Sequence, residues 1–315
     1  MNEITITRNN HLIDPSMHVW GWEIPVYLFI GGMVAGMMII SGYFLFTGRN
    51  KNSKCVCLYL PWISLFLLSL GMLALFMDLE HKLFTWRLYT TFQISSPMSW
   101  GAWILILVYP VISLNLLLNP GAFLLNKFPK LEMISARINQ KPFLLKNIGV
   151  LNMILGGMLG MYTGILLSTL SARPLWNTSI LWLLFLVSGL SAAAAFVHMI
   201  AKDVKERELL AKADNGFLIF ELFIIMLMII SFLTSSQVHI DAVMLLLSGP
   251  FAAVFWVLVI SMGIVIPLII QLLAVNHRIK HTAVAPVFVI LGGLILRFVI
   301  VSAGQYSHWF NVHLK

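Results

Sequence analysis

The feature that most constrains this chain is a series of long apolar segments that recurs from near one end to the other. We place them at approximately 22–46, 58–78, 99–118, 147–170, 178–200, 216–234, 242–272 and 283–304. A helix needs roughly 20 apolar residues to cross the hydrocarbon core of a bilayer. The sequence therefore predicts an all-α integral membrane protein, a bundle of about eight transmembrane helices that forms a single domain over residues 1–315.

Composition excludes a soluble alternative. The chain is 60% hydrophobic and only 10% charged, whereas soluble domains are roughly half apolar and about a quarter charged. The first twenty residues are polar, and the apolar segment that follows is longer than the core of a removable signal peptide. We expect that segment to remain as the first helix.

The distribution of basic residues predicts how the chain is oriented. Fourteen of the 20 Lys and Arg residues fall in the odd-numbered connections. They are Arg49, Lys51, Lys54, Lys127, Lys130, Arg137, Lys141, Lys146, Lys202, Lys205, Arg207, Lys212, Arg278 and Lys280. Because basic loops stay in the cytoplasm, both termini are predicted to lie outside, in the periplasm of a bacterial cell. The net charge of +8 is thus explained by topology and lipid contact rather than by nucleic acid, and we expect the bacterial inner membrane as the location.

Irregular features mark several segments. The seventh contains Gly249-Pro250 and Pro267, which predict a tilted or kinked helix, with a short re-entrant piece as the alternative. The aromatic connection 78–98 and the basic connection 119–146 are expected to lie at the membrane interface. Clusters of small residues predict close helix packing. They begin at Gly31, Gly156 and Ser188.

The residue inventory offers little for binding a redox metal. Cys55 and Cys57 are too few for an iron–sulfur cluster, and we interpret them as reduced loop thiols. Of nine histidines only His198 lies inside a predicted span, which argues against a haem held by two transmembrane histidines. Flavin and nucleotide signatures are also absent from the sequence. We expect no haem, flavin, iron–sulfur cluster or other metal site in this chain.

Ionisable residues near the predicted outer surface are functional candidates, because such groups are costly at membrane depth. They are Glu23, Asp78, His81 and Arg173. Each has a structural alternative. Glu23 suits a helix N-terminus, Asp78 can pair with Lys82, and Arg173 can anchor to lipid headgroups.

Four further residues lie within predicted spans, and the sequence leaves their roles open. Glu221 can snorkel from the inner end of its helix. Arg297 is expected to find a carboxylate or carbonyl partner inside the bundle. Tyr162 and His198, taken alone, are typical packing residues.

Three segments resemble the NrfD/PsrC family, the membrane subunits of polysulfide-reductase-like and nitrite-reductase-associated respiratory complexes. The first is WGWEIPVYLFIGGMVAG at 20–36 and the second is SSPMSWGAW at 95–103. The third is GMYTGILLS at 160–168, followed by RPLW at 173–176. They occur in order over the first half of the chain, and the second half matches in topology.

The resemblance implies a cofactor-free subunit that binds a quinone, commonly menaquinone, near the outer membrane face. It also implies a ferredoxin-like partner with 4Fe–4S clusters on that face, joined to a molybdopterin or multihaem catalytic subunit. Such a subunit is not an enzyme by itself; it serves a polysulfide, nitrite or other anaerobic respiratory reductase, or a quinol dehydrogenase. Carried onto this sequence, the quinone-binding residues are Tyr162, Tyr27, Glu23, His81 and Arg173, and the proton-transfer residues are Glu23, Asp78 and His81. Tyr27 stands where some members have histidine.

The chemistry of these residue types agrees with that reading. A quinol releases two protons as it loses two electrons, so its site needs hydroxyl or imidazole groups at the oxygens and carboxylates that pass protons onward. Arg173 can stabilise negative charge on a reduced ring. Two alternatives stay open. A passive anchor of a redox complex would bind no quinone, and a secondary transporter would show two related halves with broken helices, a repeat that the sequence does not reveal.

Overall fold

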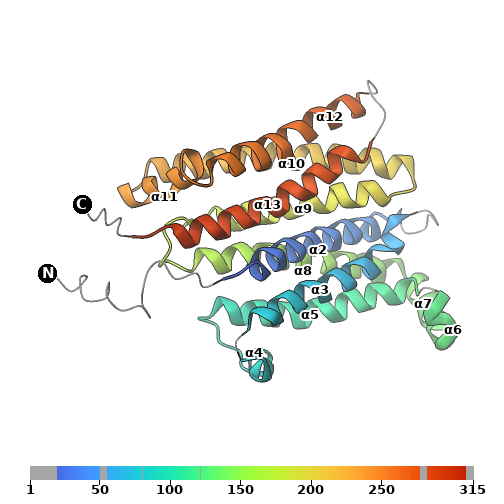
Figure 1. Cartoon of the computed structure of the whole chain (residues 1–315). Helices are drawn as coiled ribbons and strands as arrows, with labels where there is room; N and C mark the ends of the chain where they lie inside the picture. Colours follow the sequence, from blue (N-terminus) through green and yellow to red (C-terminus); the bar gives the residue numbers. More distant parts are fainter. Residues whose placement is uncertain (1–19, 50–54, 80, 121, 277–281, 310–315) are drawn as a thin grey trace.

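The computed structural model describes residues 20–49, 55–79, 81–120, 122–276 and 282–309, and within these ranges the chain is a helical bundle (Figure 1). Eight helices in this part of the chain are long and apolar enough to cross a membrane. They are α2 (Glu23–Phe46), α3 (Leu60–Asp78), α5 (Pro97–Leu118), α8 (Pro142–Ser168), α9 (Leu181–Ile200), α10 (Val204–Leu233), the η4–α12 pair (Val254–Val275) and α13 (Val284–Tyr306). The predicted number of spans is confirmed.

Local sequence signals set where several helices begin. Pro61, Pro97 and Pro142 occupy the first turns of α3, α5 and α8, where a missing N–H costs nothing. Asp203 caps α10, because its carboxylate accepts a hydrogen bond from Lys205 N at 3.2 Å. The sixth span therefore starts at Val204, earlier than the predicted 216, since its first turns are polar and extend beyond the apolar stretch.

The predicted seventh span is two elements. Helix α11 (Gln237–Leu247) ends before Gly249-Pro250, and the chain resumes as a π-helix, η4 (Val254–Val265), that continues into α12 (Ile266–Val275). The sequence predicted a single tilted or kinked helix here, but the chain is divided at Gly249-Pro250, and the bounds 242–272 are corrected to Val254–Val275. Pro267 lies in the first turn of α12, where the π-helix gives way to an α-helix.

Short elements occupy the connections. The 3-10 turn η3 (Lys82–Phe84) and helix α4 (Trp86–Thr90) lie between α3 and α5, and helices α6 (Ala122–Lys127) and α7 (Lys130–Asn139) lie between α5 and α8. Figure 1 places α4 and α6–α7 near opposite ends of the bundle. The 3-10 turn η2 (Val56–Leu58) precedes α3 and brings Cys55 and Cys57 together in a disulfide. This corrects the expectation of reduced thiols: the Cys57 N–H donates to Cys55 Sγ at 3.3 Å, so the turn folds one cysteine onto the other.

Glycines bring the central helix α2 against its neighbours. A Cβ at Gly149 of α8 would lie 2.7 Å from the carbonyl oxygen of Gly42, and one at Gly189 of α9 would lie 2.6 Å from that of Gly32. Such contacts exclude any side chain larger than hydrogen. The small-residue clusters therefore act in packing, as predicted. We divide the bundle into two groups that lie side by side in Figure 1: a first group of α2, α3, α5 and α8, and a second group of α9, α10, η4–α12 and α13. Helix α9 joins the two groups, because it also packs closely against α2 and α8.

The two described ends of the chain lie at the same end of the bundle, which we call the termini end. Trp20 N donates to Gln305 Oε1 at 3.1 Å, and Gln305 Nε2 donates to the Trp20 carbonyl at 3.0 Å. The segment that leads into α2 is thereby held to the last turn of α13. The opposite end carries α6–α7 and the connections rich in Lys and Arg, and we call it the basic end.

Candidate functional site

A cavity of about 410 Å³ lies at the termini end of the first helix group. Helices α2, α3, α4, α5 and α8 contribute its walls. Most of the lining is leucine, methionine and aromatic carbon, and the volume is within the range typical of small-molecule sites. We call it the first cavity. Its polar lining residues are Tyr27, Ser69, Asp78, Thr85, Tyr89 and Tyr162.

Two tyrosines from the central helix pair meet in this cavity. Tyr27 on α2 is 2% exposed and Tyr162 on α8 is 6% exposed, and their hydroxyls lie close enough to interact. Among the described residues Tyr27 Oη has no hydrogen-bond partner of good geometry. A buried hydroxyl without a partner is costly, so it marks a place where a bound molecule with a hydrogen-bonding oxygen fits.

Gly101 explains how Tyr162 takes its position. A Cβ at residue 101 would overlap the Tyr162 ring and hydroxyl, so the phenol lies directly on the backbone of α5. Gly101 belongs to the second of the three sequence segments and Tyr162 to the third. The spacing of the segments along the chain gave no indication of this contact.

The first and third segments also meet. The rings of Trp20 and Trp176 stack with their centroids 5.2 Å apart, and Trp176 Nε1 donates to the Ile300 carbonyl at 2.9 Å. Trp20 lines the first cavity. The three segments thus converge on one cavity even though they are spread along the chain from residue 20 to residue 176.

The predicted carboxylates lie at the edge of this site. Asp78 ends α3 and lines the cavity. Glu23, in the first turn of α2, is near enough for its charge to repel that of Asp78, but it is not among the lining residues. Its carboxylate bends back over Gly21. The structure therefore places Asp78 at the cavity and Glu23 in the neighbouring first turn of α2.

His81 and Arg173 stand further from the cavity. His81 is exposed beyond α3, with its ring 6.5 Å from that of Phe84. Arg173, in the α8–α9 connection, donates to the Ser307 carbonyl at 3.2 Å and lies 2.8 Å from His308 Nδ1. Burial lowers the pKa of Arg173. Neither residue is among those that line the first cavity.

Sequence reasoning missed Tyr89, Ser69 and Thr85. Tyr89 lies on α4, in the connection that was interpreted only as an interfacial segment. Burial, and then the neighbouring Tyr109, raises the pKa of Tyr89, so its phenol remains a hydrogen-bond donor at neutral pH. The hydroxyls of Ser69 and Thr85 donate to Leu65 and Lys82 carbonyls at 2.8 and 2.6 Å. The alternation of aromatic and polar residues between 84 and 92 indicates an amphipathic segment, but it does not show which of these side chains face the bundle.

A second set of buried polar groups lies in the other helix group. Arg297 is completely buried and donates to Ser188 Oγ, to the Phe185 carbonyl at 2.8 Å and to the Gly293 carbonyl at 3.3 Å. The expectation that it finds partners inside the bundle is confirmed. Glu221 is 4% exposed and close to Arg297, so it does not snorkel as the sequence suggested. His198 is buried near the end of α9.

No group of three or more His, Cys, Asp or Glu residues within the described ranges is arranged to hold a metal ion.

The sequence matches known proteins over nearly its whole length. The family model described as "Polysulphide reductase, NrfD" matches residues 10–307. The sequence is 30% identical to the C subunit of the polysulfide reductase of Wolinella succinogenes, over 91% of this chain and 94% of that protein. It is 29% identical to "Protein NrfD homolog" of Haemophilus influenzae, over 92% and 95%, and 27% identical to "Protein NrfD" of Escherichia coli, over 92% and 96%.

Proposed function

Because the chain belongs to the NrfD family of polysulphide reductase membrane subunits, we propose that it binds a quinone or quinol, with menaquinone as the expected species, in the first cavity. The single observation that carries this proposal is the buried Tyr27 hydroxyl, which lies beside Tyr162 at a largely apolar cavity and has no hydrogen-bond partner of good geometry among the described residues. A quinone ring supplies the flat apolar body and the carbonyl oxygen that such a place requires. When bound, the quinone would carry two electrons and two protons.

The roles of the residues follow from their positions. Tyr27 and Tyr162 would hold the ring oxygens by hydrogen bonds, and Tyr89 would hold the side of the ring that faces α4. Asp78 and Glu23, at the edge of the cavity, would pass protons between the tyrosines and the solvent. Arg173 would contribute positive charge, and His81 a hydrogen-bonding imidazole, from the neighbouring connections.

The partner is proposed to dock at the termini end. A ferredoxin-like 4Fe–4S subunit there, linked to a molybdopterin or multihaem catalytic subunit, would exchange electrons with the ring over a short distance. The first cavity and the exposed connection that contains α4 lie at this end. This chain would then be a quinone-reactive subunit that has no complete enzymatic activity by itself.

Orientation in the bacterial inner membrane is part of the proposal. The described chain ends share the termini end, and the basic residues are concentrated at the opposite end, so we assign the termini end to the periplasm. Introduced cysteines test this assignment. In intact cells a membrane-impermeant maleimide should label Ser236→Cys, in the exposed α10–α11 connection, and should not label Asn126→Cys on α6. The reverse pattern would place the termini in the cytoplasm.

Quinol-dependent turnover of the assembled complex tests the site. Tyr162→Phe should lower turnover about 100-fold, a typical contribution of a positioned proton-transfer group, and the complex should still assemble. Tyr43→Phe is the matched control, because Tyr43 lies on α2 and is 42% exposed near the basic end. Equal turnover of the two variants would remove Tyr162 from the site.

The carboxylates are tested separately. Glu23→Gln and Asp78→Asn should each lower turnover while a quinone analogue still binds, because the tyrosines that hold the ring are unchanged. If the passive-anchor alternative is correct, purified complex will bind no quinone analogue and none of these substitutions will affect turnover by the catalytic subunit.

A further inference from the structure

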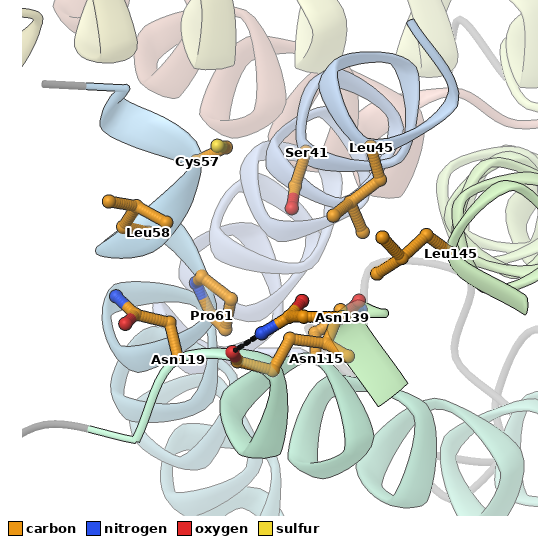
Figure 2. Close-up of a pocket in the computed structure, with 10 residues that line it drawn as sticks. Ser41, Leu45, Cys57, Leu58, Pro61, Asn115, Asn119, Asn139 and Leu145 are labelled. Carbon is orange, nitrogen blue, oxygen red and sulfur yellow. Dashed lines mark hydrogen bonds between the residues drawn. The ribbon is translucent and has the colours of Figure 1, made fainter. Parts of the chain in front are cut away.

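The first helix group contains another cavity, of about 350 Å³, at the basic end. It lies between the last turns of α2 and α5, the start of α3 and of α8, and the end of α7 (Figure 2). We call it the second cavity. Its lining residues are Ser41, Leu45, Cys57, Leu58, Pro61, Asn115, Leu118, Asn119, Asn139 and Leu145.

The second cavity is separate from the first. The two have no lining residue in common. Both touch α2, but Tyr27 and Ser41 are fourteen residues apart on it, which corresponds to roughly 21 Å along a helix. The side chains between them include Met33, Met37 and Met38, all buried. Any molecule in the second cavity is therefore not part of the quinone site proposed above, and the inference does not depend on that site.

Buried amides without partners converge on the second cavity. Asn115, on α5, is 4% exposed and lines it, and among the described residues its Oδ1 has no hydrogen-bond partner. A separate pocket of about 10 Å³ shares Ser41, Pro61 and Asn115 with the second cavity, and Asn152 lines that neighbouring pocket. Asn152 is 1% exposed, and its Oδ1 is also without a partner within the described structure. Polar groups inside a transmembrane bundle normally find partners, so the Asn115 oxygen at the second cavity, with the Asn152 oxygen in the neighbouring pocket, points to a bound hydrogen-bond donor.

The walls restrict the class of molecule that can bind. The described lining residues include no Asp, Glu, Lys, Arg or His, so a phosphate, carboxylate or ammonium group would be left without a counter-charge. The leucines and Pro61 provide apolar surface, and Ser41 and the asparagines provide uncharged polar contacts (Figure 2). Asn139 is fixed in place, because its Nδ2 donates to the Leu118 carbonyl at 2.9 Å. The volume exceeds that of a single water by roughly tenfold, since each water takes about 30 Å³.

We propose that the second cavity is a binding site for an uncharged amphipathic molecule that donates a hydroxyl hydrogen bond to Asn115. Two molecules in a bacterial membrane have this chemistry. One is the dihydroxy ring of a quinol, and the other is the free hydroxyl of a diacylglycerol. Both combine an O–H donor with an apolar body, and the cavity contains a surface for each part.

Native mass spectrometry of the detergent-purified protein, with any partner subunits that copurify, tests this site with two probes. The probes are 1,4-dihydroxynaphthalene for the quinol and dioctanoylglycerol for the lipid. We expect one of the two probes to bind. Asn115→Leu should weaken the affinity for that probe about tenfold, the effect of losing a buried hydrogen bond. Tyr162→Phe should leave this binding event unchanged. If binding of 1,4-dihydroxynaphthalene depends on Asn115, the natural ligand is a quinol. If binding of dioctanoylglycerol depends on Asn115, the natural ligand is a lipid.

Two further variants make the result decisive. Ser113→Ala is the matched control on α5, because Ser113 is exposed and donates only along its own helix, to the Tyr109 carbonyl; it should bind like the wild type. Leu145→Phe keeps the amides but fills the cavity, and should show the same loss as Asn115→Leu. If Asn115→Leu does not fold, Leu145→Phe decides alone. Binding of both probes that neither variant alters, or no binding of either, would mean that the cavity holds only water and would overturn the proposal.

Discussion

The two helix groups bury their polar side chains in different ways. In the first group, the Tyr27 hydroxyl and the Asn115 carbonyl oxygen face cavities and have no partner within the described structure. In the second group, Arg297 donates to three protein oxygens, and Asp214 accepts from Ser191 Oγ at 2.6 Å and Gln271 Nε2 at 2.7 Å. Polar groups that face open space are available to a ligand, whereas polar groups that bind one another hold helices together. The second group also contains polar atoms without a partner within the described structure, Asn215 Oδ1, Gln271 Oε1 and Arg297 Nε, so the difference is one of degree. On the proposal above, the first group binds the ligand, and the contacts of Arg297 and Asp214 in the second group support the bundle.

Arg297 should give the largest effect if this division is correct. Arg297→Met removes three buried hydrogen bonds and the positive charge that favours the buried Glu221 carboxylate, and should destabilise the protein by about 3 kcal/mol. Thermal unfolding in detergent measures the loss. The double variant Arg297→Met/Glu221→Leu should recover most of it, because both charges are then removed together. A single variant as stable as the wild type would show that Arg297 and its contacts do not hold the second group together.

Gly101 should give the next largest effect, and on binding rather than on stability. Gly101→Ala forces the Tyr162 ring to move, because the added Cβ overlaps it. We expect about tenfold weaker binding of a quinone analogue, corresponding to an overpacking cost of about 1–3 kcal/mol. Gly157→Ala on α8 is the matched control, since its Cβ would meet nothing within 4 Å. Similar binding in the two variants would contradict the placement of Tyr162 in the site.

Ser191 provides a smaller effect in the second group. Ser191→Ala removes one of the two hydrogen bonds to the buried Asp214 carboxylate and should cost about 1–2 kcal/mol of stability. Binding of a quinone analogue should not change. A variant that binds the analogue more weakly but unfolds at the wild-type temperature would mean that the second group takes part in binding.

Tyr89 should give the smallest effect. Tyr89→Phe removes one hydrogen-bond donor from the edge of the first cavity and should lower quinol turnover about threefold to tenfold. Because burial raises the pKa of Tyr89, the phenol is neutral on both sides of pH 7, and the pH profile between about 6 and 9 should keep its shape. A change in the shape of that profile would show that Tyr89 itself exchanges a proton in this range.

Much of the fold could be predicted from the sequence because it follows from local rules. The number of apolar segments, the irregularity at Gly249-Pro250 and the close packing at the glycine clusters follow from length, backbone chemistry and side-chain size, and the structure confirms them. The sixth and seventh segments have other bounds than predicted. Helix ends were less certain. The first turns of α10 are polar, so apolarity alone placed the start of that helix too late.

Only part of the candidate site could be predicted from the sequence. The resemblance indicated Tyr27, Tyr162 and Asp78, and the structure brings these three to one cavity. The contact of Gly101 with Tyr162, and the position of Tyr89, depend on how α4 and α5 pack against α8, which no local pattern encodes. The second cavity depends in the same way on the meeting of several helix ends.

The most direct test of quinone binding in the first cavity is photo-crosslinking. A naphthoquinone carrying a photoreactive group is added to the purified complex, and the labelled peptides are mapped by mass spectrometry. We predict labels on residues that line the first cavity, such as Leu28, Leu73 and Leu166, which unlabelled menaquinone removes by competition and Gly101→Ala diminishes. Competed labels confined to the second helix group, or none that menaquinone displaces, would contradict binding in the first cavity.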